Sequence, residues 1–335
     1  RLLTLILLCF MSDYSRIRMG AANNEGACSI ALQYTHYGRS INPDNTSCIR
    51  SCRSNHYSVS YLPKSGFTLL IIVNFHNVFY SNIQFFDEEY FPVFCSIYKN
   101  DFDVLFVGIQ KNDTYRVISN GLRPGGWFSY HSARVAWDYV GFDSIDRYIG
   151  MLFMNDDSFI DPLNLNDMNT SFSYYETSRS QRDDENWLWW RNKRYEGQSF
   201  EDAFNNTIQM INSNPVLRNK CGKWKLTHLA HGWSDFFYVS REQIPLFFMY
   251  ESLMFENKVF LEIAVYNIMK CITKHAINSC NHIGCVLSDY EYLHIHPFKY
   301  SRTINRIAAL QYMTRNFSRY DRVLFVNRHV VTRNG

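Results

Sequence analysis

The sequence lacks the short motifs that define several large classes of ligand-binding protein. No Gly-x-Gly-x-x-Gly and no Gly-x-x-x-x-Gly-Lys-Ser/Thr follows an apolar run, so the standard dinucleotide-binding and P-loop classes lose support. No basic run or stripe is present, and 34 Lys and Arg against 31 Asp and Glu leave a net charge of +3. A nucleic-acid backbone needs a basic surface, so we expect no nucleic-acid partner.

Apolar runs of membrane-spanning length are also absent. The longest, "RLLTLILLCFM" at residues 1–11, is shorter than the roughly 20 residues that a spanning helix needs. We expect it to be part of a signal anchor or signal peptide, and the alternative is a buried first strand or helix. Five Asn-x-Ser/Thr sequons are compatible with the secretory pathway, at Asn45, Asn112, Asn169, Asn205 and Asn316. The expected location is the Golgi or ER lumen with a type II anchor, or alternatively outside the cell.

Cysteine is present without the spacing of a zinc site. Eight of the nine cysteines lie beyond residue 11, which is an even number. The close pairs Cys48/Cys52 and Cys280/Cys285 lack the repeated short spacing and the partner histidines that zinc ligation uses. Disulfides formed in an oxidising lumen explain these cysteines better, with a connectivity that spacing does not decide.

What the sequence does contain is an alternation of buried strands and helices. Apolar residues make up 46% of the chain, enough for a substantial core. Continuous apolar runs at 67–75, 101–110 and 147–157 predict strands covered on both faces, and residues 77–95 and 129–141 between them read as helices. The order strand, helix, strand, helix, strand predicts an α/β fold with a parallel sheet.

The expected organisation is one catalytic-size domain behind a stem. Residues 1–11 are the anchor or signal peptide, and residues 12–65, polar and without a sustained period, are an irregular lead-in. The domain itself covers 66–335, with a nucleotide-binding half at 66–162 and an acceptor half at 163–305.

Polar residues follow two of the predicted strands. Asn155, Asp156 and Asp157 end the third strand, and Asn74 and His76 end the first. Ligands of open α/β sheets bind beyond the carboxyl ends of the strands, so these positions are the candidate site. The alternative for the acidic pair is an ordinary polar turn at the surface.

A divalent cation that prefers oxygen ligands needs carboxylates fixed at such an edge and a further ligand from elsewhere. Asp156 and Asp157 supply the carboxylates, and His296 in "HIHPFKYS" is the candidate for the further ligand. Lys299, three residues later, is placed to neutralise phosphate charge. A structural histidine before a proline is the alternative for His296. We expect Asp156, Asp157 and His296 to converge on one cleft.

The order of these features resembles a known family. A strand ending in "NDD", the segment "SDFFYVS", an acid in "FLEIAVYNI" and a late "HPFK" are similar in layout to metal-dependent nucleotide-sugar glycosyltransferases of the GT-A fold. Within that group the chain looks most like the exostosin-like domain and the STELLO-type proteins of plants and nematodes. The resemblance covers residues 65–305. It implies a Rossmann-like, mostly parallel central sheet flanked by helices, with a mixed α/β acceptor-binding second half.

The resemblance also implies roles for individual residues. Asp157 would bind Mn²⁺ or Mg²⁺ at the diphosphate of a donor such as a UDP-sugar, and Asp156 would contact the ribose or share the metal. His296 would be the distant metal or diphosphate ligand. Asn74 is a candidate for contacting the nucleotide base, or alternatively a cap or turn residue. Asn155 would also line the donor site, but it stands where the family's Asp-x-Asp motif has its first acid.

Two further acids are candidates for the acceptor side. Glu262 lies between Leu261 and Ile263, where an unpaired charge is costly unless the helix opens into a cleft. It would deprotonate an acceptor hydroxyl or stabilise a cationic sugar, and the alternative is an exposed helix face. Asp235 would orient acceptor hydroxyls beside a sugar-stacking Trp233. A second aromatic platform, or simply loop packing, is expected at Trp187, Trp189 and Trp190.

These expectations describe an enzyme that transfers a sugar from a nucleotide-sugar donor to a glycan or glycoprotein acceptor in the secretory pathway. The stereochemistry of transfer is open. The alternative is a catalytically inactive GT-A-like protein that binds glycan, which the substitution at Asn155 favours. A metal-dependent glycoside hydrolase is more distant, because no pair of carboxylates facing one bond can be placed.

Overall fold

The structure is a computed structural model, and it describes twelve stretches of the chain: residues 48–53, 56–59, 68–76, 80–123, 126–176, 194–221, 231–277, 279–280, 292–300, 302–314, 322–325 and 330–333. The expected anchor at residues 1–11 and the three tryptophans at 187–190 lie outside them. None of the helices in these stretches combines the length and the apolar character that crossing a membrane requires.

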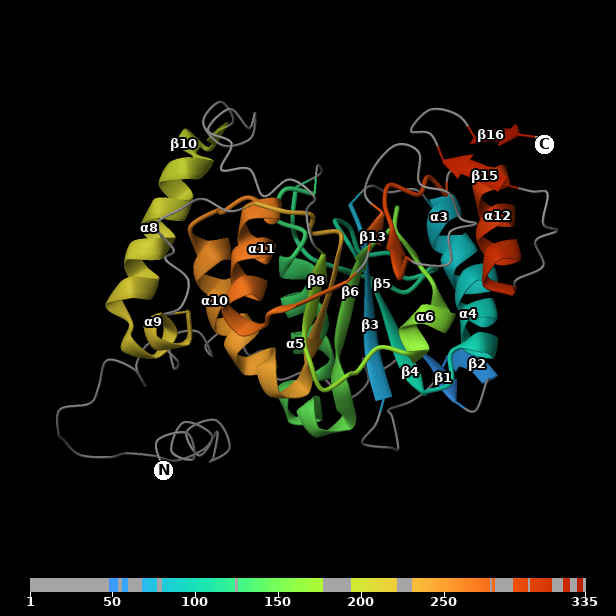
Figure 1. The fold of residues 1–335 in the computed structure, drawn as a ribbon, viewed down its shortest axis with the longest axis horizontal. Coiled ribbons are helices and arrows are strands. Elements are labelled where there is room, and N and C mark those ends of the chain that lie inside the picture. The colour runs from blue at the N-terminus through green and yellow to red at the C-terminus, as the bar shows by residue number, and fades with distance from the viewer. Residues whose placement is uncertain are drawn as a thin grey trace.

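A nine-stranded mixed sheet forms the centre of the molecule (Figure 1). From one edge to the other its strands are β12 (His275–Ile277), β8 (Tyr174–Glu176), β11 (Phe236–Ser240), β6 (Tyr148–Asn155), β3 (Thr68–Phe75), β4 (Phe102–Gly108), β1 (Arg50–Arg53) and β2 (His56–Val59), and β5 (Val117–Ser119) pairs with β4. The predicted α/β class is confirmed.

The three predicted strands form the middle of this sheet as a parallel unit. β3 pairs in parallel with β4 on one side and with β6 on the other. Every residue of β3 is buried, because alternate side chains enter opposite layers. Leu70 and Ile72 belong to one hydrophobic core, whereas Leu69, Ile71 and Val73 belong to the other. The continuous apolar run in the sequence is the signature of this two-sided burial.

The outer strands make the sheet mixed rather than mostly parallel. β11 is antiparallel to both β6 and β8, and β1 is antiparallel to β4 and β2. β1 and β2 lie within residues 12–65, where an irregular lead-in was expected. The apolar residues Ile49 and Cys52 are nonetheless buried there, so part of that segment completes the sheet.

Helices cover both faces of the sheet (Figure 1). One layer contains the continuous helical stretch α3 (Tyr80–Phe85), η2 (Phe86–Tyr90) and α4 (Phe91–Ile97), together with α12 (Thr303–Thr314). The other layer contains α5 (His131–Val140), α8 (Phe200–Ser213), α9 (Pro215–Cys221), α10 (Ile244–Glu256) and α11 (Leu261–Ile272). Further short elements are η3 (Phe142–Arg147), α6 (Pro162–Asn166), β9 (Arg194–Tyr195), β10 (Gln198–Ser199) and η4 (Arg241–Gln243). A two-stranded hairpin is formed by β15 (Arg322–Phe325) and β16 (Val330–Arg333).

The order of the central strands creates a ligand-binding position. The chain passes from β3 through α3 and α4 to β4 on one face, and then through α5 to β6 on the other face. The crossover from β3 to β4 and the crossover from β4 to β6 therefore lie on opposite faces and lead to opposite sides of β3, so the strand order reverses between β3 and β6. Such a switch point is where open α/β sheets bind ligands.

A small second sheet brings the late part of the chain to this edge. β7 (Phe159–Ile160) follows the acidic residues directly and pairs antiparallel with β14 (His294–Ile295), which pairs with β13 (Ser279–Cys280). In this register Ile295 lies opposite Phe159. The next residue, His296, is therefore brought back to the acidic turn.

Two disulfides connect elements of the body. Cys52 of β1 is bonded to Cys95 of α4, and Cys221 at the end of α9 is bonded to Cys271 of α11. The expectation of disulfides is confirmed, and the Cys48/Cys52 pair does not bond, because Cys48 is a free thiol. Disulfides of this kind are typical of an oxidising, extracytoplasmic compartment.

Candidate functional site

The acidic turn after β6 is held between two strand ends. The backbone N–H of Asp156 donates to the carbonyl of Asn74 at 2.9 Å, and the N–H of Asn155 donates to the carbonyl of Asp235 at 3.1 Å. These bonds continue the β3–β6 and β6–β11 ladders by one residue. Because β11 is antiparallel to β6, its first residues lie beside the last residues of β6. Asp235 therefore lies at the same edge as the acidic turn.

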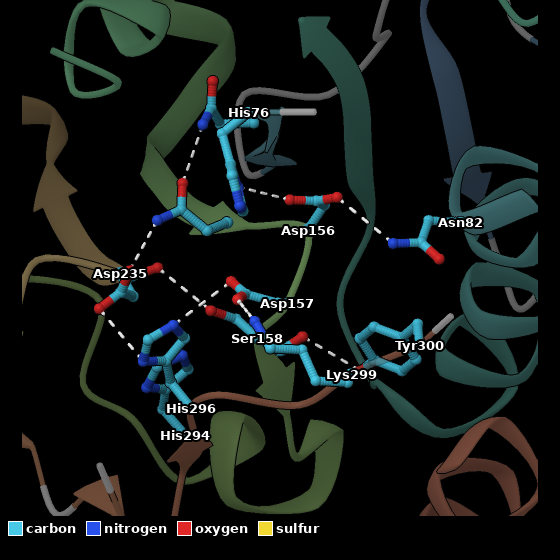
Figure 2. A network of polar contacts seen from close by, with 12 residues as sticks. His76, Asn82, Asp156, Asp157, Ser158, Asp235, His294, His296, Lys299 and Tyr300 are labelled. Atoms are coloured by element: carbon cyan, nitrogen blue, oxygen red, sulfur yellow. Dashed lines mark hydrogen bonds and ion pairs between the residues drawn. The ribbon is translucent and has the colours of Figure 1, made fainter. Parts of the chain in front are cut away.

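Asp157 is the most strongly paired acid of this edge. Lys299 donates to Oδ2 at 2.6 Å, and His296 Nε2 lies 3.3 Å from Oδ1 (Figure 2). The N–H of Phe298 donates to the Asp157 carbonyl, which fixes the two segments against each other. Burial alone would raise the pKa of Asp157, but the charges of His296 and Lys299 hold it well below its ordinary value. Asp157 is thus a carboxylate at neutral pH.

Asp235 faces the same histidine from the other side. Its Oδ2 lies 3.3 Å from His296 Nδ1, and its Oδ1 accepts from the Asn155 side-chain amide at 2.7 Å. Burial raises the pKa of Asp235. Burial by itself would lower the pKa of His296, but Asp235 and Asp157 outweigh it and raise that pKa to about 9.

Asp156 points to a different set of partners (Figure 2). Its Oδ1 lies 2.7 Å from His76 Nδ1, and its Oδ2 accepts from Asn82 of α3 at 3.4 Å. Asp156 is 2% exposed, whereas a quarter of the His76 side chain is exposed. Although burial opposes it, the contact with Asp156 raises the pKa of His76.

A neutral network lies behind the acids. Asn74 Oδ1 accepts from Ser132 at 2.7 Å and from Asn120 at 3.5 Å, and Asn74 Nδ2 donates to Asn155 Oδ1 at 2.9 Å. Asn74 has no exposed surface. Both ends of its amide are therefore used within the protein, and the side chain presents no surface to a nucleotide base. Its position fixes the side chain of Asn155, and through it Asp235.

The close contacts around His296 are not all hydrogen bonds. Asp157 Oδ1 and His296 Nδ1 are buried and have no hydrogen-bond partner among the described residues, even though charged atoms lie 3.3 Å away. Ligand atoms that surround one cation at ordinary bond lengths lie roughly 3 Å apart. Because an imidazole gives one cation a single nitrogen, only one of the two 3.3 Å contacts can be a distance between ligands of that cation. Asp157, Asp235 and His296 can each offer one ligand atom within 4.8 Å of the others. Two carboxylates and an imidazole fit a divalent cation such as Mn²⁺.

The structure groups the predicted ligands differently from the sequence. His296 lies beside Asp157, as expected, but the third member of that group is Asp235, which was expected to contact the acceptor. Asp156 joins His76 and Asp157 in a second group. The side chain of Asn155 donates a hydrogen bond to Asp235.

Glu262 lies near this site in the first turn of α11. Burial raises its pKa to about 8, with the charge of Asp235 adding to the increase and that of His296 opposing it. The carbonyl of Glu262 accepts from the N–H of Gly232 at 3.1 Å, which ties α11 to the segment before Asp235. The ring of Trp233 lies 6.2 Å from that of His296.

A buried acid and histidine behind the site had no role in the sequence prediction. Glu176 of β8 and His294 of β14 have no exposed surface and share a hydrogen bond at 2.5 Å. The ring of His294 is almost parallel to that of His296, 6.4 Å away. The alternating His-x-His is the only sequence signal for this pair. Nothing in the segments "YYE" and "HIH" indicates that Glu176 and His294 contact each other.

Together these features define an α/β protein with a mixed central sheet flanked by helices and a buried Asp/His cluster at the switch point. No protein-family model matches the sequence, and no curated protein matches it significantly. Its function is therefore inferred from the site.

Proposed function

We propose that this chain is a divalent-cation-dependent glycosyltransferase of the GT-A type, which transfers a sugar from a nucleotide-sugar donor to a glycan or glycoprotein acceptor. The observation that carries the proposal is the convergence of Asp157, Asp235 and His296 at the carboxyl ends of β3 and β6, with Lys299 on Asp157. A buried site that combines carboxylates, an imidazole and a lysine at this edge suits a nucleoside diphosphate and its cation.

Asp157, Asp235 and His296 would hold the cation, and Asp156 would remain beside it. Carboxylates suit both Mn²⁺ and Mg²⁺, and the imidazole favours Mn²⁺. A bound cation supplies positive charge that stabilises the departing nucleoside diphosphate. Lys299 adds a second positive charge from a position that is 43% exposed, so its ammonium can contact a phosphate arriving from solvent.

Glu262 and Trp233 fit the acceptor side. A carboxyl whose pKa is about 8 is a stronger base than an ordinary one once it has lost its proton, so Glu262 can take a proton from a sugar hydroxyl as the pH rises towards 8. Trp233 is partly exposed next to His296 and can stack on a sugar face.

The cellular setting follows the same proposal. We infer that the protein works in the lumen of the Golgi or ER, membrane-anchored or secreted, because both disulfides need an oxidising compartment. Among the sequon asparagines in the described chain, Asn169 and Asn205 are exposed.

The test is release of nucleoside diphosphate from a panel of nucleotide sugars, with and without Mn²⁺. Wild type should turn over at least one donor only with the cation, and Asp157→Asn should lose that turnover. Asp113→Asn is the matched control, because it neutralises an aspartate whose side chain is 82% exposed. Turnover that needs neither Mn²⁺ nor Asp157 would contradict the mechanism. Glycan binding without turnover of any donor would support the inactive glycan-binding alternative instead.

A further inference from the structure

Asp157 belongs to two groups of possible ligands. One group is Asp157, Asp235 and His296, and the other is Asp157, Asp156 and His76, each with ligand atoms within 4.8 Å of one another. The proposed function uses only the first. The second group comes from two different strands, because His76 follows β3 and Asp156 follows β6.

The second group contains an ion pair whose facing atoms could also serve as ligands of a cation. His76 Nδ1 and Asp156 Oδ1 are 2.7 Å apart, yet neither atom has an aligned hydrogen-bond partner within the described chain. Asn82 contacts the other oxygen of Asp156, Oδ2. The Oδ1 atom of a carboxylate that is 2% exposed is thus left facing an imidazole nitrogen and Asp157. Burying a charge in this way is costly unless another positive charge compensates it.

We propose that His76, Asp156 and Asp157 hold a second divalent cation, so that Asp157 is shared between two cation sites. This inference rests on the proposed function for the first site. Paired cations that share a carboxylate and lie about 3.5–4 Å apart are a known arrangement in phosphoryl-group chemistry.

The charges at the site agree with two cations. Three carboxylates, Asp156, Asp157 and Asp235, face one lysine, Lys299, which leaves two net negative charges when the histidines are neutral ligands. One divalent cation would neutralise them. Two would leave the site with two net positive charges, which match the two negative charges of the diphosphate in a nucleotide sugar.

The experiment counts bound Mn²⁺ per chain by equilibrium dialysis with Mn²⁺ alone and records the EPR spectrum of the bound ions. Wild type should bind two ions whose EPR signals are coupled. His76→Ala should bind one, with the spectrum of an isolated Mn²⁺. Asp156→Asn, which keeps the side-chain size, should do the same, so the result does not depend on whether one variant folds. His131→Ala is the control, because His131 is paired with the buried Glu251 and belongs to neither group.

The number of bound Mn²⁺ ions tests the second cation site separately from the proposed function. One ion in wild type that His76→Ala retains would overturn the second site and leave the proposed function standing. Two ions in both wild type and His76→Ala would overturn the assignment to His76. No bound ion in wild type would overturn the second site and the cation dependence of the proposed function together.

Discussion

The side-chain amide of Asn155 donates a hydrogen bond of 2.7 Å to Oδ1 of Asp235, a residue eighty positions later in the chain. This bond gives a physical reason for an asparagine at the first position of "NDD". An acid is not needed there, because Asp235 brings a carboxylate to the same edge from the neighbouring strand β11. Asn155 is suited to hold that carboxylate, since an amide N–H can donate and a carboxylate cannot.

Restoring an acid at this position should therefore harm the protein. Asn155→Asp would replace the donor to Asp235 with an oxygen and so place two carboxylates 2.7 Å apart in a buried site, whereas the bond that Oδ1 accepts from Asn74 could remain. We expect the free energy of unfolding of the metal-free protein to fall by about 1–3 kcal/mol at pH 7. Chemical denaturation measures the change. Asn205→Asp, which adds the same charge at an exposed position of α8, should have little effect. An Asn155→Asp protein as stable as wild type would contradict the assigned role.

Removing the lysine charge should affect turnover more than donor binding. Lys299→Met keeps the length of the side chain but loses the ammonium that contacts Asp157 at 2.6 Å. We expect kcat for donor turnover to fall about 100-fold, because charge develops on the leaving group in the transition state. Steady-state kinetics separates kcat from KM. Lys111→Met is the control, since Lys111 is an exposed lysine whose carboxylate partner, Asp113, is also exposed. An effect confined to KM would assign Lys299 to binding alone.

The raised pKa of Glu262 predicts a pH dependence of stability. A carboxyl group whose pKa is about 8 when folded, and ordinary when unfolded, binds more protons in the folded state between these values. Its contribution to stability is therefore present at low pH and is lost as pH rises towards 8. Glu262→Gln removes this contribution. The free energy of unfolding of wild type, relative to that of the variant, should therefore fall as the pH rises from about 4.5 to 8. The slope should be at most about 1.4 kcal/mol per pH unit. A difference that does not change with pH would show that Glu262 is not held protonated by burial.

The disulfide between Cys221 and Cys271 should stabilise the helical layer that carries Glu262. It connects the end of α9 to α11, fifty residues later. Replacing both cysteines by serine should lower the free energy of unfolding by about 2–5 kcal/mol. Peptide mapping without reduction should recover this pair and Cys52–Cys95. Recovery of Cys48 bonded to Cys52 would contradict the connectivity.

The sequence predicted the centre of the fold because local patterns determine it. The apolar runs that became β3, β4 and β6 are buried on both faces, and two-sided burial leaves a continuous hydrophobic signature. The antiparallel pairing of the outer strands was not predicted, because it depends on contacts between short strands: β8 has three residues and β14 has two. Strands of that length are stabilised by their neighbours rather than by their own pattern.

The difference between local patterns and strand pairing also explains which site residues were predicted. Asp156, Asp157, His296 and Lys299 were recognisable because each follows or lies close to a strand end. Asp235 was placed with the acceptor, because nothing in "GWSDFF" indicates that β11 runs antiparallel beside β6. His76 was noted at the end of β3, but its contact with Asp156 depends on pairing across two strands. Asn74 was assigned to a nucleotide base because a sequence does not show that both ends of its amide are already bonded.

In the proposed cation site Asp235, rather than residue 155, supplies the second carboxylate. The most direct test is the Mn²⁺ dependence of nucleoside diphosphate release by Asp235→Asn, compared with wild type at the same donor concentration. We expect the variant to need at least about tenfold more Mn²⁺ for half-maximal release, because one ligand oxygen loses its charge. An unchanged Mn²⁺ requirement in a folded Asp235→Asn protein would contradict it.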